Sequence, residues 1–493
     1  MTKLAGAFTP VIPMDRRSDQ PLNAQVYRAL RSAITRGSLR GGQRVPSSRA
    51  MSAELNVSRI TVLGAYAQLR AEGYFETRKG AGTFISGSLP EHLTQVKRPA
   101  VGRAQKASGP RPVARRALLY PDRPTRPWVA GLGAFAVHQP AFEEFPYTTW
   151  SRLVTHHSKN PNARAIHCID PMGSRRFREA ICDYLRTARA VQAEPEQIMI
   201  VSGSQQALQI TANVLLDPGT PVWMEEPGYR LARDVFLAAG CRPVPIPVDA
   251  GGLNVTAGIK RCAHARAAYV TPSHQYPLGS TMSAARRLQL LNWAQQQGAW
   301  IIEDDYDSEY RFESAPVSSL QGLDTNERVI YIGTFSKVLF ASLRLGYMVI
   351  PPDLVERFVA VRYVMDIFPP YLYQDVVADF IREGHFARHI RRMRLLYSGR
   401  RRVLVEQLRK VFGDTFEIHG AAAGMHLTAA FHGDRDDVEI ATRAAAQGLW
   451  LWPLSANYAT RHDRKGFILG YGNVGLQAIP AAVEKLRVAM ARE

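Results

Sequence analysis

The sequence predicts an α/β protein with two unlike parts, a small helical module followed by a large domain whose mostly parallel sheet is sandwiched by helices. Apolar residues at helical spacing, with glycines and serines between them, indicate several short elements in the first 86 residues. From about residue 165, apolar strand-like runs alternate with helical stretches, a pattern typical of the predicted sandwich. The 493 residues, 46% of them hydrophobic, are enough for a large core.

The basic excess of the chain lies mostly at its amino-terminal end. Residues 1–86 carry a net charge of +8 and residues 87–126 a net charge of +7, out of +19 for the whole chain. Because the remaining 367 residues carry only +4, the charge favours a polyanion such as DNA as the partner of the amino-terminal part.

The cysteines and the amino terminus bear on the compartment of the protein. No CxxC pair and no histidine at metal-ligand spacing accompanies the four cysteines, which are Cys168, Cys182, Cys241 and Cys262. We expect buried, reduced thiols and no metal site. No apolar signal region and no run of about 18 apolar residues occurs, so we expect a cytoplasmic protein with no membrane partner.

The amino-terminal module is predicted to contain three helices and a hairpin. The helices are expected over residues 22–34, 48–55 and 59–72, and the two strands over 74–78 and 83–85. Ser58 can cap the third helix and Gly73 can end it, while a basic, glycine-rich tip joins the strands. Helix, helix, turn, helix and hairpin in this order predict a winged helix-turn-helix over residues 16–86.

The runs VPSSR (45–49) and VSRITV (57–62) resemble the GntR family of bacterial DNA-binding domains. Arginine can contact phosphates or guanine edges, and a wing glycine lets the backbone approach DNA closely. The alternative is that the arginines are ordinary solvated charges. The resemblance implies that the residues contacting DNA are Arg49, Ser58, Arg59, Thr61, Lys79 and Gly80.

Residues 87–126 are predicted to be a flexible basic linker. Its central part, 97–116, contains seven basic residues, three prolines, two glycines and no acid, with little to bury. Its charge could add non-specific phosphate contacts, or the segment could be a passive spacer.

In the large domain, Lys337 is the residue most indicative of chemistry. Only 10 of the 62 basic residues are lysines, and this one follows an apolar strand-like run, 329–333. A desolvated lysine can lose its proton and form a Schiff base, which arginine cannot do. Arg344, seven positions further on, could hold a phosphate, so the two residues suggest a site for pyridoxal 5'-phosphate (PLP).

Three other segments are consistent with this idea. The strand-like run 198–201 leads into SGSQQAL (202–208), a turn and helix start that can bind an anion. Tyr229 follows another strand and could stack on a flat ring, although plain packing also explains it. The run 299–302 ends abruptly in EDDYD (303–307), and PLP needs a carboxylate beside its pyridine nitrogen. An acidic surface loop is the alternative for this last segment.

In chain order, SGSQQAL, EEPGY, EDDYDSEY and TFSKVLFASLRLGY resemble the class I aminotransferase fold. With the amino-terminal module, nearly the whole chain resembles the MocR/GabR family of bacterial regulators. The resemblance implies a fold-type I domain over 127–493, with a small carboxy-terminal α+β subdomain. It assigns Lys337 to the internal aldimine with PLP, Asp304 to the pyridine nitrogen and Tyr306 to the ring hydroxyl. It assigns stacking to Tyr229, and the phosphate to Ser204, Gln205, Thr334, Ser336 and Arg344.

Two positions depart from the enzymes of that fold. Tyr276 stands where aminotransferases usually have an asparagine before Pro-Thr-Gly. The final strand-like run, 467–473, has no arginine at its end for a substrate carboxylate, although Arg461 and Arg464 lie just upstream. We therefore expect an effector other than an ordinary α-amino acid, such as PLP itself, an amine or a sulfonate.

We predict a PLP-dependent transcription regulator, a homodimer that binds double-stranded operator DNA with paired half-sites. An effector amine or PLP, sensed at the Lys337 aldimine, would change DNA binding without full enzymatic turnover. One alternative is a true aminotransferase with an appended DNA-binding module. The other is a DNA-binding protein whose enzyme-like domain is dead and takes no PLP.

Overall fold

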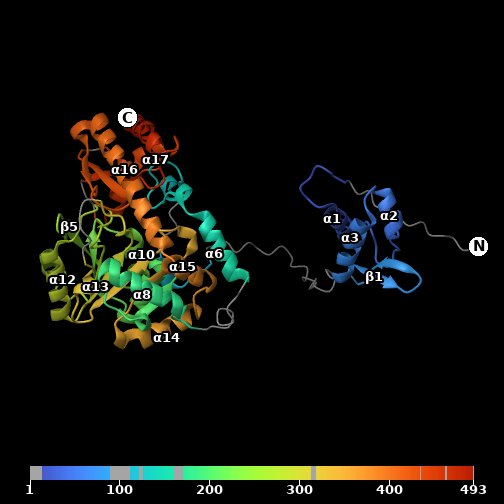
Figure 1. Cartoon of the computed structure of the whole chain (residues 1–493), viewed down its shortest axis with the longest axis horizontal. Helices are drawn as coiled ribbons and strands as arrows, with labels where there is room; N and C mark the ends of the chain where they lie inside the picture. Colours follow the sequence, from blue (N-terminus) through green and yellow to red (C-terminus); the bar gives the residue numbers. More distant parts are fainter. Residues whose placement is uncertain are drawn as a thin grey trace, which may run out of the picture. The chain divides into compact units, whose positions relative to one another are not determined.

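The computed structural model describes residues 14–88, 111–120, 126–159, 170–312, 318–433, 435–460 and 464–491. The chain divides into two compact units between Arg111 and Pro112. We call the described residues 14–88 the head and the residues from 112 onwards the large unit (Figure 1). No helix within these described ranges combines the length and apolar character needed to cross a bilayer.

The head contains three helices and one antiparallel hairpin. They are α1 (Leu22–Thr35), α2 (Ser48–Glu54), α3 (Arg59–Ala71), β1 (Phe75–Arg78) and β2 (Gly82–Ile85). Ser47 and Ser58 cap α2 and α3, each accepting a hydrogen bond from a backbone N–H three residues on. Apolar side chains of all five elements, Leu30 and Phe75 among them, form one core. The winged helix-turn-helix predicted from the sequence is therefore confirmed.

An eight-stranded sheet forms the centre of the large unit, in the order β3-β10-β9-β8-β7-β4-β5-β6. The strands are β3 (Ile198–Val201), β4 (Pro221–Glu226), β5 (Arg242–Asp249), β6 (Gly252–Leu253), β7 (Ala267–Val270), β8 (Trp300–Asp305), β9 (Val329–Thr334) and β10 (Gly346–Val349). From β5 to β9 the neighbours are parallel, whereas β10 is antiparallel to both β3 and β9. The predicted mostly parallel sheet is thus confirmed.

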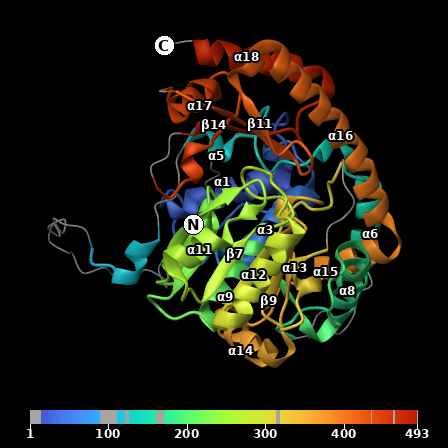
Figure 2. The same ribbon diagram turned by 90° about the vertical axis from the view of Figure 1, so that its left-hand side faces the viewer.

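Helices surround this sheet, and a smaller sheet lies towards the carboxyl terminus (Figure 2). The smaller sheet has the order β11-β12-β14-β13, with β11 (Glu417–His419), β12 (His426–Phe431), β13 (Trp452–Pro453) and β14 (Lys465–Gly470). The helices are α5 (Pro127–Ala130), α6 (Tyr147–Lys159), α8 (Arg175–Arg189), α9 (Ser204–Leu215), α10 (Arg230–Ala238), α11 (Val255–Cys262), α12 (Ala284–Gln297), α13 (Leu320–Leu323), α14 (Val355–Asp366), α15 (Leu372–Arg382), α16 (His385–Phe412), α17 (Asp437–Ala445) and α18 (Ile479–Ala491).

Figure 2 shows how the large unit is divided between the two sheets. The small sheet with α17 and α18 lies at one end, and the long helix α16 runs from there along the side of the molecule. The buried sheet strands read as continuous apolar runs, as expected for a sheet covered on both faces. The carboxyl ends of β4, β7, β8 and β9 therefore meet at one edge, where open α/β sheets bind ligands.

Most of the predicted linker lies outside the described residues. Within it, Arg115–Leu119 form a short 3-10 helix, η1, which contacts α10 of the large unit. Of the four cysteines, Cys182, Cys241 and Cys262 are buried and free, and Cys168 lies outside the described residues.

Candidate functional site

A cavity of about 240 Å³ opens at the carboxyl edge of the large sheet. Every residue that the sequence assigned to PLP lines it: Ser204, Gln205, Tyr229, Asp304, Tyr306, Thr334, Ser336, Lys337 and Arg344. These residues come from the start of α9, the loop after β4, the end of β8 with the residue after it, and the end of β9 with the segment after it. The structure thus brings together side chains separated by up to 140 positions, although their roles stay predictions.

Lys337 lies three residues beyond the end of β9 and lines the cavity. Desolvation by the surrounding protein lowers its pKa to about 8, because burial disfavours the ammonium form. The carboxylates of Asp307 and Asp304 act in the opposite direction, and Arg344 lowers the pKa further. A lysine held in this way has a much larger neutral fraction near neutral pH than an ordinary lysine, and the neutral amine can act as a nucleophile.

Asp304 lies near the end of β8 and is only 4% exposed. Its Oδ2 accepts a hydrogen bond of 2.8 Å from the hydroxyl of Tyr269, whereas Oδ1 has no partner. Burial raises the pKa of Asp304 to about 7, an effect that the Tyr269 hydrogen bond reduces. A buried carboxylate oxygen without a donor is costly, so this atom is poised for a donor supplied by a ligand in the cavity.

The acids on either side of Asp304 are fixed by the protein itself. Glu303 accepts hydrogen bonds from the backbone N–H groups of Leu320 and Gln321, at 2.9 and 3.0 Å. Asp305 Oδ2 accepts bonds from Arg189 Nε at 2.7 Å and from the Tyr331 hydroxyl at 2.6 Å, while Asp305 Oδ1, which does not line the cavity, has no partner. The acidic end of β8 is therefore a buried network, and the alternative of an acidic surface loop is wrong.

Tyr306 is held by a buried histidine–aspartate pair. His274 Nδ1 lies 3.1 Å from the Tyr306 hydroxyl and 3.1 Å from both carboxylate oxygens of Asp307. A proton on Nδ1 can be shared by these acceptors, which leaves the phenolic proton free to point into the cavity. Gly424 makes room for the pair, since a Cβ there would lie 2.1 Å from His274 Cε1.

An anion corner closes one end of the cavity at the start of α9. Gly203, with φ of +106°, precedes the helix, and a Cβ at this position would lie 3.4 Å from the Arg344 guanidinium. Arg344 itself has a φ of +51° and makes no ion pair with any described carboxylate. The unpaired N–H groups of a helix start, an arginine and the hydroxyls of Ser204 and Ser336 together provide the donors that a phosphate needs.

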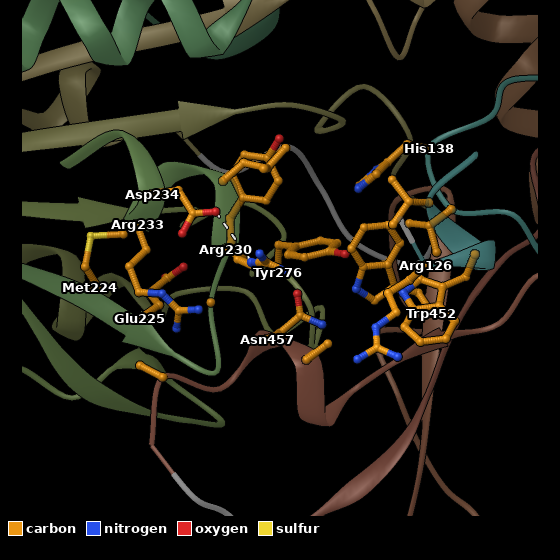
Figure 3. A pocket seen from close by; sticks show the side chains of 18 of the residues that line it. Arg126, His138, Met224, Glu225, Arg230, Arg233, Asp234, Tyr276, Trp452 and Asn457 are labelled. Atoms are coloured by element: carbon orange, nitrogen blue, oxygen red, sulfur yellow. Dashed lines mark ion pairs between the residues drawn. The ribbon is translucent and has the colours of Figure 1, made fainter. Parts of the chain in front are cut away.

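A second cavity of about 940 Å³ adjoins the first, and Figure 3 shows it. His138, Tyr276 and Lys337 line both cavities, so a ligand approaching Lys337 can pass from one to the other. Three arginines line the outer cavity, namely Arg126, Arg230 and Arg233. The Nε of Arg230 lies 3.5 Å from Asp234 Oδ2, whereas no described carboxylate pairs with the other two.

The arginines near the final strand do not supply a carboxylate site within the described residues. Strand β14 ends at Gly470, and Arg464, at its other end, donates to Glu417 at 3.0 Å. Arg461 lies outside the described residues. Tyr276 is buried in the cavity wall, 5.3 Å from His138 between ring centroids.

In the head, the predicted DNA-contacting residues lie on α2, α3 and the hairpin tip. Arg49, Arg59, Lys79 and Gly80 are exposed. Ser58 and Thr61 also have local roles, since Ser58 Oγ accepts from the Thr61 N–H and their hydroxyls lie 2.8 Å apart. Arg59 Nε donates to Ser48 Oγ at 3.3 Å, which holds this guanidinium beside the start of α2.

Several residues of the cavity were not predicted from the sequence. His138 lies about 200 positions before Lys337, on backbone with φ of +71°, and no local motif announces it. Tyr269 lies near the carboxyl end of β7 and Thr271 directly follows this strand, so the strand-end rule that found Asp304 would also have found them. The arginines of the outer cavity could not be singled out from the sequence, because arginine is so common in this chain.

Two family models match the chain. The model of the bacterial regulatory proteins of the gntR family matches residues 22–85, and that of aminotransferases of class I and II matches residues 152–459. Together with the geometry above, these matches define a transcription regulator with a DNA-binding head and an aminotransferase-like domain.

Individual relatives share this organisation. The probable rhizopine catabolism regulatory protein MocR of Rhizobium meliloti is 39% identical over 97% of this chain and 96% of its own length. The HTH-type pyridoxine biosynthesis transcriptional regulator PdxR of Corynebacterium glutamicum is 29% identical over 94% of each chain. The chain therefore belongs to the MocR-type transcriptional regulators.

Among solved structures, the chain is similar to LysN, an α-aminoadipate aminotransferase from Thermus thermophilus complexed with N-(5'-phosphopyridoxyl)-L-leucine. The identity is 25% and the TM-score 0.71, over 77% of this chain and 97% of that one. This likeness covers the large unit and confirms its aminotransferase fold.

The lowered pKa of Lys337 predicts an unusual pH dependence of its reactivity. In cofactor-free protein, its acylation by an amine-selective reagent should rise with pH through a midpoint of about 8, against about 10.4 for ordinary lysines. Peptide mass spectrometry at low conversion measures the rate for each lysine. In Asp307→Asn the midpoint should fall, because a charge favouring the ammonium is lost; a midpoint near 10 in the wild type would contradict the account.

Proposed function

We propose that this transcription regulator binds PLP covalently at Lys337 and that a small-molecule effector at the same site changes its binding to operator DNA. One observation carries the proposal. A reactive lysine, a buried carboxylate oxygen without a donor and an arginine-lined helix start open into one cavity of about 240 Å³. These are the three groups that PLP requires, for its aldehyde, its pyridine nitrogen and its phosphate.

The residues of the cavity fit PLP group by group. PLP supplies an aldehyde that condenses with amines and a ring that withdraws electrons. Asp304 Oδ1, which lacks a donor, would accept from the ring nitrogen, and the Tyr306 hydroxyl would donate to the ring oxygen. Tyr229 would cover one ring face. The phosphate would be held by Ser204, Gln205, Thr334, Ser336 and Arg344.

The outer cavity is where we place the effector. It is about four times larger than the inner one and reaches Lys337 past His138 and Tyr276. An amine fits the chemistry of Lys337, because it can take the place of the lysine nitrogen. Arg126 and Arg233, which lack carboxylate partners among the described residues, favour an effector that also carries an anionic group; PLP itself is the other candidate.

Sensing requires no complete transamination. The protein needs two arrangements, one that binds DNA well and one that binds it poorly. The effector shifts the balance between them if it binds one arrangement more tightly than the other. The rival function, a true aminotransferase with a DNA-binding head, demands repeated turnover with an amino donor and a keto acceptor.

The visible absorption spectrum tests the proposal. Purified wild-type protein supplied with PLP should show the band of lysine-bound cofactor, and Lys337→Ala should lose it. Amines are then added one at a time, with keto-acid release measured alongside. A band shifted by one amine without keto-acid release supports a sensor, repeated turnover supports the enzyme, and no band with added PLP refutes cofactor binding.

We also propose that the regulator works as a homodimer. Exposed apolar side chains gather at the end of α14 and the start of α15: Tyr363, Val364, Met365, Ile367, Phe368, Leu372 and Tyr373. Val364 is 86% exposed. This surface adjoins the cofactor cavity, because Asp366 accepts a hydrogen bond of 2.8 Å from Gln206 in the first turn of α9. A second copy would cover it and would provide two heads for paired half-sites.

As a homodimer, the protein should have a mass in solution of twice the 54.9 kDa of the chain. Val364→Glu should shift the protein towards the monomer, because it places a charge in the covered apolar surface. Light scattering after size exclusion measures both masses, and a wild-type monomer at micromolar concentration would refute the proposal. Leu395→Glu, at an exposed position on α16, is the control for an exposed apolar residue outside this surface.

A further inference from the structure

One exposed apolar residue lies where the head would meet base edges. Ile60 is the second residue of α3, and its side chain is 81% exposed. The other large apolar residues of α3 are mostly used differently, since Val62, Tyr66 and Leu69 are buried in the core of the head. A single exposed apolar residue needs no explanation by itself. The position of Ile60 relative to a neighbouring hollow, however, suggests a role for this exposed side chain.

That hollow, of about 410 Å³, lies between α3, the hairpin and residues 44–48, which lead into α2. No acidic residue lines it, and Tyr66 on its wall donates its hydroxyl proton to the carbonyl of Pro46. The other polar residues of its lining are arginines, serines and threonines: Arg44, Ser47, Ser48, Arg70, Thr77 and Thr83. Guanidinium and hydroxyl donors of this kind bind phosphates, so the hollow suits the sugar–phosphate backbone of DNA.

Helical spacing connects the hollow to Ile60. Leu63, Ala67 and Arg70 line the hollow from α3, and position 60 lies one turn before Leu63 on the same face. The first turn of α3 carries Arg59 and Ile60. With the sugar–phosphate backbone of DNA in the hollow, this turn would point towards the base edges. This is how the recognition helix of a helix-turn-helix enters the major groove.

An isoleucine side chain has no donor or acceptor, so it can distinguish base pairs only by apolar contact. In the major groove the one apolar group among the base edges is the 5-methyl of thymine. We propose that Ile60 reads a thymine in each operator half-site by contact with its methyl group. Ile60 is thus a specificity-determining residue of the head, while the hollow fixes the backbone and carries no sequence information.

Replacement of thymine by uracil tests this, because uracil pairs identically and lacks only the methyl. Full-length protein is first used to select its sites from random duplex DNA. Each thymine of the selected site is then replaced in turn. Wild-type affinity should fall about fourfold at one thymine per half-site, the loss expected for one buried methyl-sized group. Ile60→Ala should bind the thymine and uracil sites equally.

Matched variants distinguish a contact between Ile60 and the thymine methyl from other causes of weaker DNA binding. Thr61→Ser removes a neighbouring methyl, and Leu63→Ala removes an apolar side chain that lines the hollow. Whatever their overall affinity for DNA, both variants should keep the wild-type ratio of affinities for the thymine and uracil sites. Ile60→Val should keep part of the wild-type preference for thymine. Unchanged thermal unfolding shows that the head of each variant is folded. The proposal is overturned if no uracil weakens wild-type binding, or if Ile60→Ala responds to uracil as the wild type does. Failure to select any sequence would instead refute DNA reading by the head as a whole.

Discussion

The candidate site of the large unit depends on two ionisable side chains that are buried side by side at the carboxyl edge of the large sheet. Asp304 lies near the end of β8 and Lys337 follows the adjacent parallel strand β9. Burial raises the pKa of Asp304 and lowers that of Lys337, so it favours the neutral form of both groups. Burial of this kind costs free energy unless each group has a partner. Asp304 Oδ1 and Asp305 Oδ1 both lack a hydrogen-bond partner, but of these two residues only Asp304 lines the cavity. Asp304 therefore offers a carboxylate oxygen to a ligand in the cavity.

The sequence predicted the elements of the fold well where local signals act. Serine caps, glycine stops and apolar periodicity located the helices of the head to within about two residues. Motif residues at strand ends, such as Asp304 and Lys337, come together because the ends of parallel strands share an edge. The antiparallel insertion of β10 between β3 and β9 was not predictable, since no local pattern encodes which strands pair.

The rest of the site escaped prediction for physical reasons. His138 reaches the cavity through a backbone conformation that side chains rarely adopt, and its distance in sequence hides it. The partner of Tyr306 is His274, a contact that depends on how β7 and β8 pack and on the space left by Gly424. Ile60 looked like an ordinary helix residue, and only its exposure together with its place on the face of α3 that lines the hollow distinguishes it.

The central claim is that occupancy of the Lys337 site and DNA binding are coupled, and linkage makes this measurable in both directions. We would measure operator affinity with and without PLP, and PLP affinity with and without operator, on the same full-length protein. We expect PLP to change operator affinity by a factor different from one, operator DNA to change PLP affinity by the same factor, and neither effect in Lys337→Ala. Equal operator affinity with and without PLP, and with every amine that shifts the spectrum, would contradict this claim.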